Sequence, residues 1–485
     1  MAWPALALGA IGAALAAVLA VRRGARHAGA RTLLRRRARV DRYKLARRSY
    51  VRAELLADRS LAEAVRQYAA ERGLGERSAW DAVDHYIDEI VPAFNVLAYY
   101  KFGYAATRVL LGLLYEVDVE YEDRAANERL PRDAVPVYLI NHRSNADYLL
   151  VGYALAGEVA ISYAVGEWAR VFPLDRIFKA FGAYFVRRRF RDSLYHAVLE
   201  HYVQLITRRG VTQGIFPEGG LSRDGRMRPA KIGLLDYILG VARDPAFRDR
   251  LHVVPVALNY DRVLEDRSLL RELASSEGRP TPSRLRELWG VARYLWWNSG
   301  RLALRRWRRY GRAAVTIGRP IPLAPWLADP DGGGSLFSLP RPERLARVQA
   351  LADGVMSKIG ALIPVTPVSL ACAALQSLDR DFVLRSGLLA RMMEMRDVLV
   401  GLNARVVRDE SDMERTLERA LRLLLMRRVL APEGDGFAVL PRGRPLISYY
   451  ANSVAHLLGP FEAGVRERDA LPALLVTGEH AALPA

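Results

Sequence analysis

Between about residues 115 and 325, short β-rich runs alternate with stretches of helical spacing, and this alternation constrains the fold more than any other feature. Runs of β-branched and aromatic residues predict strands, and apolar residues three or four positions apart predict helices. A chain that alternates the two typically forms an α/β domain with helices packed on a sheet. The predicted strands cover residues 117–121, 135–140, 160–165, 183–187, 214–217, 252–258 and 314–317.

The amino-terminal region has a different pattern. Residues 2–21 are uncharged and almost wholly apolar, and residues 22–50 are rich in arginine. As a helix, the apolar run would be about 30 Å long, enough to cross a bilayer. Positive charge after such a run keeps the rest of the chain in the cytoplasm. We therefore expect a membrane anchor; a cleaved signal peptide is the alternative, although its charge normally precedes the apolar run.

The lone cysteine agrees with a cytoplasmic setting. Cys372 lies in the mostly apolar run 368–375 and has no second cysteine to pair with. It is therefore expected to be a buried small hydrophobe. Together with the anchor, this predicts a location at the cell (inner) membrane, with the catalytic domain on the cytoplasmic side.

The charge of the chain favours anionic partners. The 485 residues carry a net charge of +19, which suits nucleic acid, acidic lipid surfaces or phosphorylated small molecules. Residues 284–310 hold four of the eight tryptophans among many arginines, as suits the headgroup layer of a membrane. A basic surface helix with inward-packed tryptophans is the alternative. Because the arginines match no nucleic-acid fold signature, we expect anionic membrane lipids as partners and no nucleic acid.

His142 and Asp147 form the first candidate catalytic pair. The predicted strand 135–140 would deliver His142 to its carboxyl end. Asp147 can accept a hydrogen bond from one ring nitrogen, so that the other can take a proton from an attacking hydroxyl. This is a Ser-His-Asp triad without its serine, so the substrate must supply the nucleophile. Taken alone, the pair also fits a helix-start histidine held by a surface aspartate.

Three further segments and a cluster of cations accompany the pair. Residues 182–189 place consecutive arginines after an apolar run, which suits a phosphate. Residues 216–220, Phe-Pro-Glu-Gly-Gly, end a strand in a turn whose glycines permit close backbone approach and whose Glu218 can hold a substrate hydroxyl. A strand at 253–256 contains a proline that could shape a pocket wall. Solvated arginines, an ordinary turn and an edge strand are the plain alternatives. The cations that follow Glu218 are Arg223, Arg226, Arg228 and Lys231.

In this order and spacing the segments resemble the glycerolipid acyltransferase superfamily, and more closely its glycerol-3-phosphate acyltransferase branch. That branch has the motif His-Arg-Ser-x-x-Asp-Tyr, which residues 142–148 match. Its Gly-x-x-Phe-Ile-Arg-Arg resembles residues 182–188, and its Lys-x-Gly matches Lys231 and Gly233. Its late Tyr-Tyr-x-Asn-x-x-x-His resembles residues 449–456. The resemblance covers roughly residues 90–460.

The resemblance implies an enzyme that moves a fatty acyl group from an acyl thioester, acyl-CoA or acyl-carrier protein, to the sn-1 hydroxyl of glycerol 3-phosphate. The product would be lysophosphatidate, in the first step of phospholipid biosynthesis. His142 would be the base, Asp147 would orient it, and Glu218 would bind the acceptor's hydroxyls. Backbone amides at the start of the helix after His142 would receive the oxyanion. No metal or cofactor is expected. The implied substrate-binding residues are Arg143, Ser144, Phe185, Arg187, Arg188, Gly219, Gly220, Arg223, Arg226, Lys231 and Pro255.

The fold implied is α/β, a mixed sheet flanked by helices, with an amino-terminal membrane-anchor helix and a mostly helical carboxyl-terminal region. The expected segments are 1–21, the apolar anchor; 22–90, a basic and helical segment; 91–340, the catalytic domain; and 341–485, the mostly helical domain.

Two departures from the family pattern leave alternatives open. Leu221 stands where the family usually has arginine, and the long amino-terminal region of the large bacterial members is missing. The acceptor could therefore be dihydroxyacetone phosphate or lysophosphatidate. A hypothesis from another class is a basic membrane-surface binding protein without catalysis.

Overall fold

The computed structural model describes residues 48–92, 104–155, 161–166, 178–179, 182–187, 190–276, 309–328, 335–407 and 412–459. The predicted anchor at 2–21 and residues 284–308 of the Trp/Arg segment lie outside these ranges. Within the ranges, no helix combines the length and the apolar character needed to cross a membrane.

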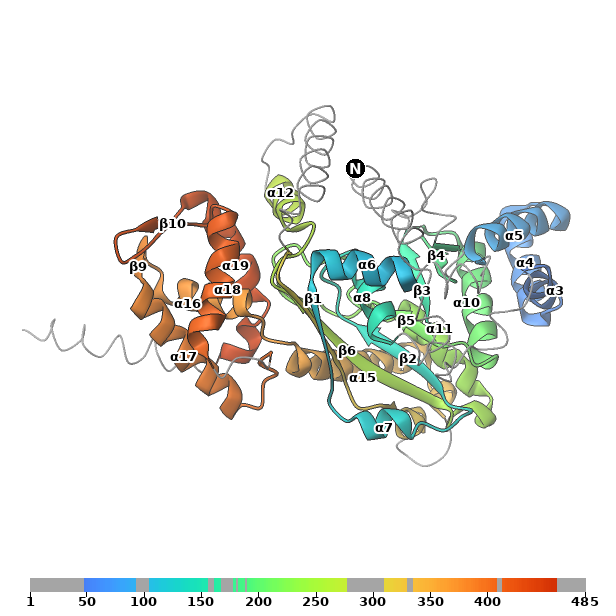
Figure 1. Ribbon diagram of the computed structural model, residues 1–485. Coiled ribbons are helices and arrows are strands. Elements are labelled where there is room, and N and C mark those ends of the chain that lie inside the picture. Colours follow the sequence, from blue (N-terminus) through green and yellow to red (C-terminus); the bar gives the residue numbers. More distant parts are fainter. Residues whose placement is uncertain are drawn as a thin grey trace, which may run out of the picture.

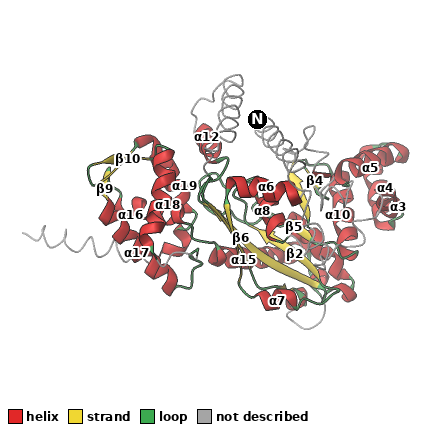
Figure 2. Cartoon of the chain, in the orientation of Figure 1, coloured by secondary structure: helices red, strands yellow, loops and turns green. Residues whose placement is uncertain are grey.

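A mixed sheet forms the centre of the molecule (Figure 2). Among the described residues it has eight strands, in the order β1-β7-β6-β2-β5-β3-β4, with β8 paired to β6. All neighbours run parallel except β6 with β7 and β6 with β8. The predicted mixed α/β sheet is therefore confirmed. Its strands are β1 Glu116–Tyr121, β2 Val135–Ile140, β3 Ser162–Gly166, β4 Tyr184–Val186, β5 Gln213–Ile215, β6 Leu251–Tyr260, β7 Arg312–Ile317 and β8 Ile321–Pro322.

Strand direction determines where the candidate residues gather. The strand β2 is buried along its whole length, and an interior parallel strand needs such a continuous apolar run because helices pack on both of its faces. Because β2, β3, β4, β5 and β6 all run the same way, their carboxyl ends share one edge of the sheet. The segments that follow these strands begin at that edge, where ligands of open α/β sheets bind.

Pro255 lies inside β6 and not on an edge strand, and the pairing explains why it is tolerated. One flank of β6 pairs with β2, whereas the other flank pairs with β8 at residues 252–253 and with β7 at residues 256–260. Pro255 falls where the partner changes, and its carbonyl accepts a hydrogen bond from the amide of Gly318 at 2.8 Å. The amide hydrogen that proline lacks would point to this same flank, so no bond to β2 is lost.

Helices cover the sheet, and a further group of helices lies at one end of the molecule. The α3–α5 group packs on α10, α6 packs on α8, and α15 packs along β6. Figure 1 shows α3–α5 at one end of the molecule. The helices of this part are α3 Arg48–Leu56, α4 Arg59–Arg72, α5 Glu76–Ile90, α6 Tyr104–Leu114, α7 Arg124–Glu128, α8 Asp147–Ala154, α10 Ser193–Arg208, α11 Gly233–Leu239, α12 Asp266–Ser276, α14 Ala324–Leu327 and α15 Arg341–Leu362.

The carboxyl-terminal lobe, residues 364–407 and 412–459, lies at the other end of the molecule (Figure 1, orange to red). Four helices pack with a small antiparallel sheet of order β10-β11-β9. The predominance of helix matches the sequence pattern of this region. Its elements are α16 Pro367–Leu378, β9 Phe382–Leu384, α17 Arg385–Gly401, α18 Met413–Met426, β10 Leu430–Glu433, β11 Gly436–Val439 and α19 Arg444–Asn452.

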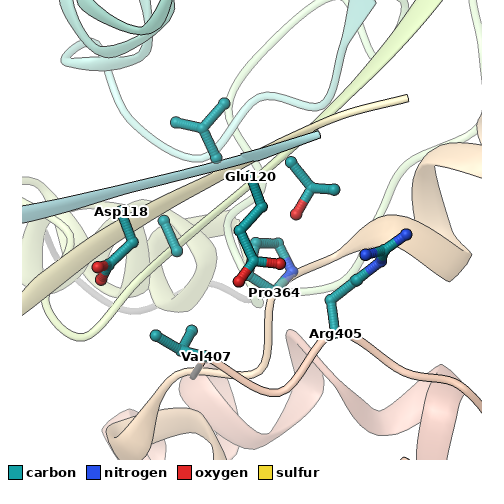
Figure 3. A pocket seen from close by; sticks show the side chains of 8 residues that line it. Asp118, Glu120, Pro364, Arg405 and Val407 are labelled. Atoms are coloured by element: carbon teal, nitrogen blue, oxygen red, sulfur yellow. The ribbon is translucent and has the colours of Figure 1, made fainter. Parts of the chain in front are cut away.

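Polar contacts attach the lobe to the sheet. The Asn259 side-chain amide donates to the carbonyl of Pro364 at 2.9 Å, and the Asp261 carboxylate accepts from the amides of Arg312 and Val368 at 2.8 and 3.0 Å. Beside them a small hollow is lined by side chains of β1 and β7 from the sheet and by Pro364 and Arg405 from the lobe (Figure 3). The lobe thus meets the sheet at the end of β6, next to the edge that carries His142.

Candidate active site

His142 lies in the loop between β2 and α8, and Asp147 is the first residue of α8. The ring Nδ1 is 2.9 Å from Asp147 Oδ2, and the two side chains are 2% and 0% exposed. A surface aspartate beside a helix-start histidine would be largely exposed, so the structure contradicts that alternative. With Nδ1 donating to the carboxylate, proton acceptance falls to Nε2 of the neutral ring.

The Asp147 carboxylate organises the whole loop. Besides the ring, Oδ2 accepts hydrogen bonds from the amides of Arg143 and Ser144 at 2.7 and 3.0 Å. Oδ1 accepts from the hydroxyl of Tyr260, at the end of β6, at 2.6 Å. Four donors on one buried carboxylate offset the cost of removing its charge from water. Asp147 therefore holds the ring, the backbone beside it and the neighbouring strand in one arrangement.

Neighbouring side chains fix the position and orientation of the His142 ring. The Asn141 amide exchanges two hydrogen bonds with the backbone of Leu258, at 2.7 and 3.0 Å, and so continues the ladder between β2 and β6 by one residue. Phe216 stacks on the His142 ring with centroids 4.1 Å apart, and Tyr148 meets it edge-on at 5.7 Å. The imidazole is thus confined by rings on two sides.

Glu218 is buried at 1% exposure and binds backbone groups. Its Oε1 accepts from the amide of His142 at 2.9 Å, and its Oε2 accepts from the amide of Arg228 at 3.0 Å. The carboxylate therefore joins the His142 loop to the segment that carries the cations. The predicted contact with an acceptor hydroxyl stays a prediction.

A pH effect on stability follows from this burial. Desolvation raises the pKa of Glu218 to about 7 from an ordinary 4.5, although Arg143 opposes the rise. Between these values the folded state keeps a proton that the unfolded chain has lost, so stability decreases as the pH rises through this window. We expect Glu218→Gln, which does not titrate, to reduce the fall in unfolding free energy between pH 5 and pH 8 by up to about 3 kcal/mol.

Urea denaturation at both pH values measures this change. Glu433→Gln, which alters an exposed carboxylate of β10, is the matched control. Its unfolding free energy should change between pH 5 and pH 8 by as much as that of the unaltered protein. If the unfolding free energies of Glu218→Gln and the control change equally between the two pH values, the raised pKa of Glu218 is contradicted.

The backbone amides of residues 142–147, which lead into α8, already donate hydrogen bonds to groups of the protein. His142 donates to Glu218, Arg143 and Ser144 donate to Asp147, and Asn145 donates to Glu265 at 3.3 Å. The next two amides donate to the side chain and the carbonyl of Ser144. Buried carboxylates and Ser144 thus bind the amides of residues 142–147, and the expectation that amides at the start of this helix receive the oxyanion stays a prediction.

Arg143 and Ser144 bind protein groups. The Arg143 guanidinium is 2% exposed and donates to the carbonyls of Gly225 and Ser453. The Ser144 hydroxyl donates to Glu265 Oε2 at 2.7 Å. In this structure both residues connect the catalytic loop to other segments, and their predicted contacts with substrate stay predictions.

Arg187 follows β4 on the same sheet edge, three strands from β2, which at the usual strand spacing is about 14 Å across the sheet. Its guanidinium forms a bidentate ion pair with Glu89 of α5 and lies over the ring of Phe190. A phosphate at Arg187 would compete with Glu89. Phe185 is buried in β4, and Arg188 lies outside the described residues.

The remaining predicted residues gather near Glu218. Gly219 has a φ of +65°, and a side chain there would strike the Lys231 side chain, which lies across the turn. Arg223 is half exposed and 3.4 Å from Glu272, and Arg226 is exposed. Gly220 completes the turn. Pro255, by contrast, packs beside Gly318 and Leu362 on the β6 strand.

Sequence reasoning gave no role to several residues that support the site. Tyr260, Phe216 and Asn141 contact the His142–Asp147 pair or its strand, and Glu265 contacts the loop from the segment after β6. The positions of Tyr260 and Glu265 at the end of a predicted strand could have indicated them, because that end shares the sheet edge with His142.

Comparison with known proteins agrees with this geometry. The family described as "Acyltransferase" matches residues 124–259, and the one described as "Glycerol-3-phosphate acyltransferase C-terminal region" matches residues 299–460. A glycerol-3-phosphate acyltransferase of Pseudoalteromonas translucida is 27% identical over 85% of this chain and 50% of its own. Those of Aeromonas hydrophila and Xanthomonas campestris are 28% and 29% identical, over 85% and 83% of this chain and 50% and 45% of theirs.

The chain is thus similar to glycerol-3-phosphate acyltransferases over most of its length. It spans about half the length of the curated relatives it matches. The solved 1-acyl-sn-glycerophosphate (LPA) acyltransferase of Thermotoga maritima is 17% identical over 64% of this chain and 87% of its own, with a TM-score of 0.28.

Two features that bear on the likeness to these acyltransferases lie at the site. Leu221, which replaces the usual arginine, is partly buried and packs against the core. The Tyr-Tyr-x-Asn motif of α19 lies against the loop after Glu218: the Asn452 amide donates to the carbonyl of Asp224 at 2.8 Å, and a side chain on Gly225 would overlap the Tyr449 carbonyl. The carboxyl-terminal motif therefore belongs to the surroundings of the catalytic loop.

Proposed function

We propose that the protein transfers a fatty acyl group from an acyl thioester to the sn-1 hydroxyl of glycerol 3-phosphate and so forms lysophosphatidate. The observation that carries this proposal is the buried His142–Asp147 pair, 2.9 Å apart at the carboxyl edge of β2, within the residues that match the acyltransferase family. Glycerol 3-phosphate is the acceptor that the names of the relatives indicate.

The reaction needs one displacement. Nε2 of His142 takes the acceptor's hydroxyl proton while the oxygen attacks the thioester carbonyl carbon. The tetrahedral intermediate then collapses, the carbon–sulfur bond breaks, and the leaving thiolate takes the proton from the imidazolium. Asp147 keeps the ring oriented and stabilises its cationic form. The products are the acyl ester and the free thiol, with no acyl-enzyme and no cofactor.

Cations near the Glu218 turn would hold the phosphate and place the hydroxyl for attack. Lys231 lies across Gly219, and Arg223 and Arg226 lie on the loop that Glu218 ties to His142. Such positioning can contribute more than proton transfer itself. Arg187, at the same sheet edge, is a further candidate, and so is the adjacent Arg188 in the sequence.

The product is amphiphilic and would leave into a bilayer. We assign the protein to the cytoplasmic side of the cell membrane, held by the apolar run at 2–21 and by anionic lipids around the arginine-rich residues 22–50. The acyl donor would be acyl-CoA or acyl-carrier protein, and the latter would then also be a protein partner.

A panel of acceptors tests the proposal. The full chain, purified in detergent and returned to vesicles, is given radiolabelled acyl-CoA or acyl-carrier protein with glycerol 3-phosphate, dihydroxyacetone phosphate or lysophosphatidate. We expect labelled lysophosphatidate, with glycerol 3-phosphate giving the highest kcat/KM. No transfer to any of the three would overturn the proposal.

Leu221 favours one second candidate, the same chemistry on another acceptor. Without the usual arginine, the site offers one cation fewer to a phosphate, which would weaken discrimination between dihydroxyacetone phosphate, lysophosphatidate and glycerol 3-phosphate. If one of the other two gives the highest kcat/KM in the panel, this second candidate replaces the first.

A further inference from the structure

The segment after β6 contains two adjacent carboxylates that face different parts of the molecule. Glu265 is 6% exposed; its Oε2 accepts from the Ser144 hydroxyl at 2.7 Å, and its Oε1 accepts from the Asn145 amide at 3.3 Å. Glu265 is separated in sequence from Ser144 by 121 positions and from Asn145 by 120 positions. Glu265 therefore holds the turn between His142 and Asp147 from outside the loop.

The next residue is held by the carboxyl-terminal lobe. Asp266, 2% exposed, receives both terminal nitrogens of Arg427, at 2.5 and 2.8 Å, and the hydroxyl of Tyr450. The same hydroxyl accepts from the amide of Val263 at 3.0 Å. A buried bidentate ion pair with an added hydroxyl allows little movement, because any displacement would leave charges unpaired away from water.

The rest of the loop shows why Glu265 matters. Asp147 and Glu218 fix the backbone at residues 142–144 from within the α/β domain. The Ser144–Asn145 turn is held through Glu265, and α8, which begins at Asp147, follows directly. A shift of this turn would move Asp147 relative to the His142 ring.

We propose that Glu265 is a positioning residue for the His142–Asp147 pair, and that the Asp266–Arg427–Tyr450 cluster fixes Glu265 to the carboxyl-terminal lobe. The lobe thereby becomes part of the machinery that holds the catalytic loop. This inference rests on the proposed function for its kinetic consequences only, since the contacts themselves do not depend on the substrate.

The kinetic test compares Glu265→Ala and Glu265→Gln with the unaltered chain in vesicles. We expect Glu265→Ala to lower kcat by about 10²-fold, the order that a displacement of about 1 Å can cost, with the KM of both substrates nearly unchanged. Glu265→Gln, which keeps one acceptor oxygen, should lose less and serves if the alanine variant does not fold. A kcat within about two-fold of the unaltered chain for both would overturn the proposal.

A double-mutant cycle asks whether Glu265 acts through Ser144. Ser144→Ala and Glu265→Ala each remove the hydrogen bond between these two side chains, so their combination should lower kcat hardly more than the stronger single change. If the two losses multiply, the residues act independently and the proposal fails. A raised KM in Ser144→Ala alone would place that hydroxyl on substrate and would also contradict it.

Hydrogen exchange gives a readout that needs no activity. We expect Glu265→Ala and Arg427→Met to speed amide exchange in residues 143–147 while α10 stays as protected as before. Arg444→Ala, which breaks an exposed ion-pair group of the same lobe with Asp379 and Asp381, is the control and should change neither region. Unchanged exchange at 143–147 overturns the positioning role, whereas an inactive unaltered chain overturns the proposed function alone.

Discussion

Replacing His142 by alanine is expected to abolish acyl transfer, with kcat at least about 10³-fold below that of the unaltered chain. The ring is the group that takes the hydroxyl proton, and its side chain is 2% exposed between Phe216 and Tyr148. Bulk water therefore cannot easily reach the position of Nε2 to act as a substitute base. Initial rates with radiolabelled acyl thioester and glycerol 3-phosphate measure the loss.

Alanine also leaves a cavity under the aromatic rings and a buried carboxylate without its ring partner, so stability must be measured in parallel. His142→Asn is the matched variant, because its side-chain amide can still donate to Asp147 but offers no basic nitrogen at the position of Nε2. Both variants should be inactive, and the asparagine variant should melt closer to the unaltered chain. Activity in His142→Asn above about a tenth of the original would contradict the assignment of the base.

The same variants separate the enzyme from a non-catalytic membrane-surface protein. Binding of the full chain to anionic vesicles depends on basic and apolar residues, not on the imidazole. We therefore expect His142→Asn to sediment with such vesicles as well as the unaltered chain. Vesicle binding with no acyl transfer by either protein would favour the non-catalytic hypothesis.

The sheet could be predicted from sequence because its signals are local. The predicted strand 135–140 has the same bounds as β2, and the other main strands fall within a few residues of their predicted positions. Buried parallel strands need continuous β-branched runs, and the sequence displays these directly. The short strand β9 escaped prediction because three residues carry no periodicity and its pairing with β11 is set by tertiary contacts.

The catalytic pair could be predicted as well, since His142 and Asp147 lie close together in the sequence. The partners that hold the pair could not. Glu265 and Tyr260 reach it from 113 to 121 residues away, and the only signal in their own sequence neighbourhood is the predicted strand that precedes them. Their role arises only when β6 pairs with β2 and brings its carboxyl end beside the loop.

The arginine block shows the opposite case, a local pattern whose partner is distant. Consecutive arginines after an apolar run indicated a phosphate site. The structure pairs the guanidinium of Arg187 with Glu89 of α5, a carboxylate 98 residues earlier, and lays it over Phe190. Sequence alone cannot tell a ligand-binding arginine from one that joins a strand to a helix, because both use the same bidentate geometry.

Asp147→Asn is expected to lower kcat by about 10²–10³-fold while the fold is kept, because it removes a charge and preserves most hydrogen bonds. The asparagine carbonyl can replace Oδ2 as acceptor for the ring and for the amides of Arg143 and Ser144. Its amide group then faces the hydroxyl of Tyr260, which can turn and accept. The negative charge that stabilises the imidazolium is lost.

Tyr260→Phe is the matched control for that change. It removes one hydrogen bond to Asp147 Oδ1 but leaves the carboxylate charged beside the ring. A single neutral hydrogen bond contributes about 1 kcal/mol, so kcat should fall by about five-fold at most. Steady-state kinetics and thermal melting of both variants compare the two effects. If Tyr260→Phe costs as much as Asp147→Asn, or if Asp147→Asn stays within about three-fold of the unaltered chain, Asp147 acts on the ring only by holding its position. In that case the charge of the carboxylate makes no separate contribution to the transition state.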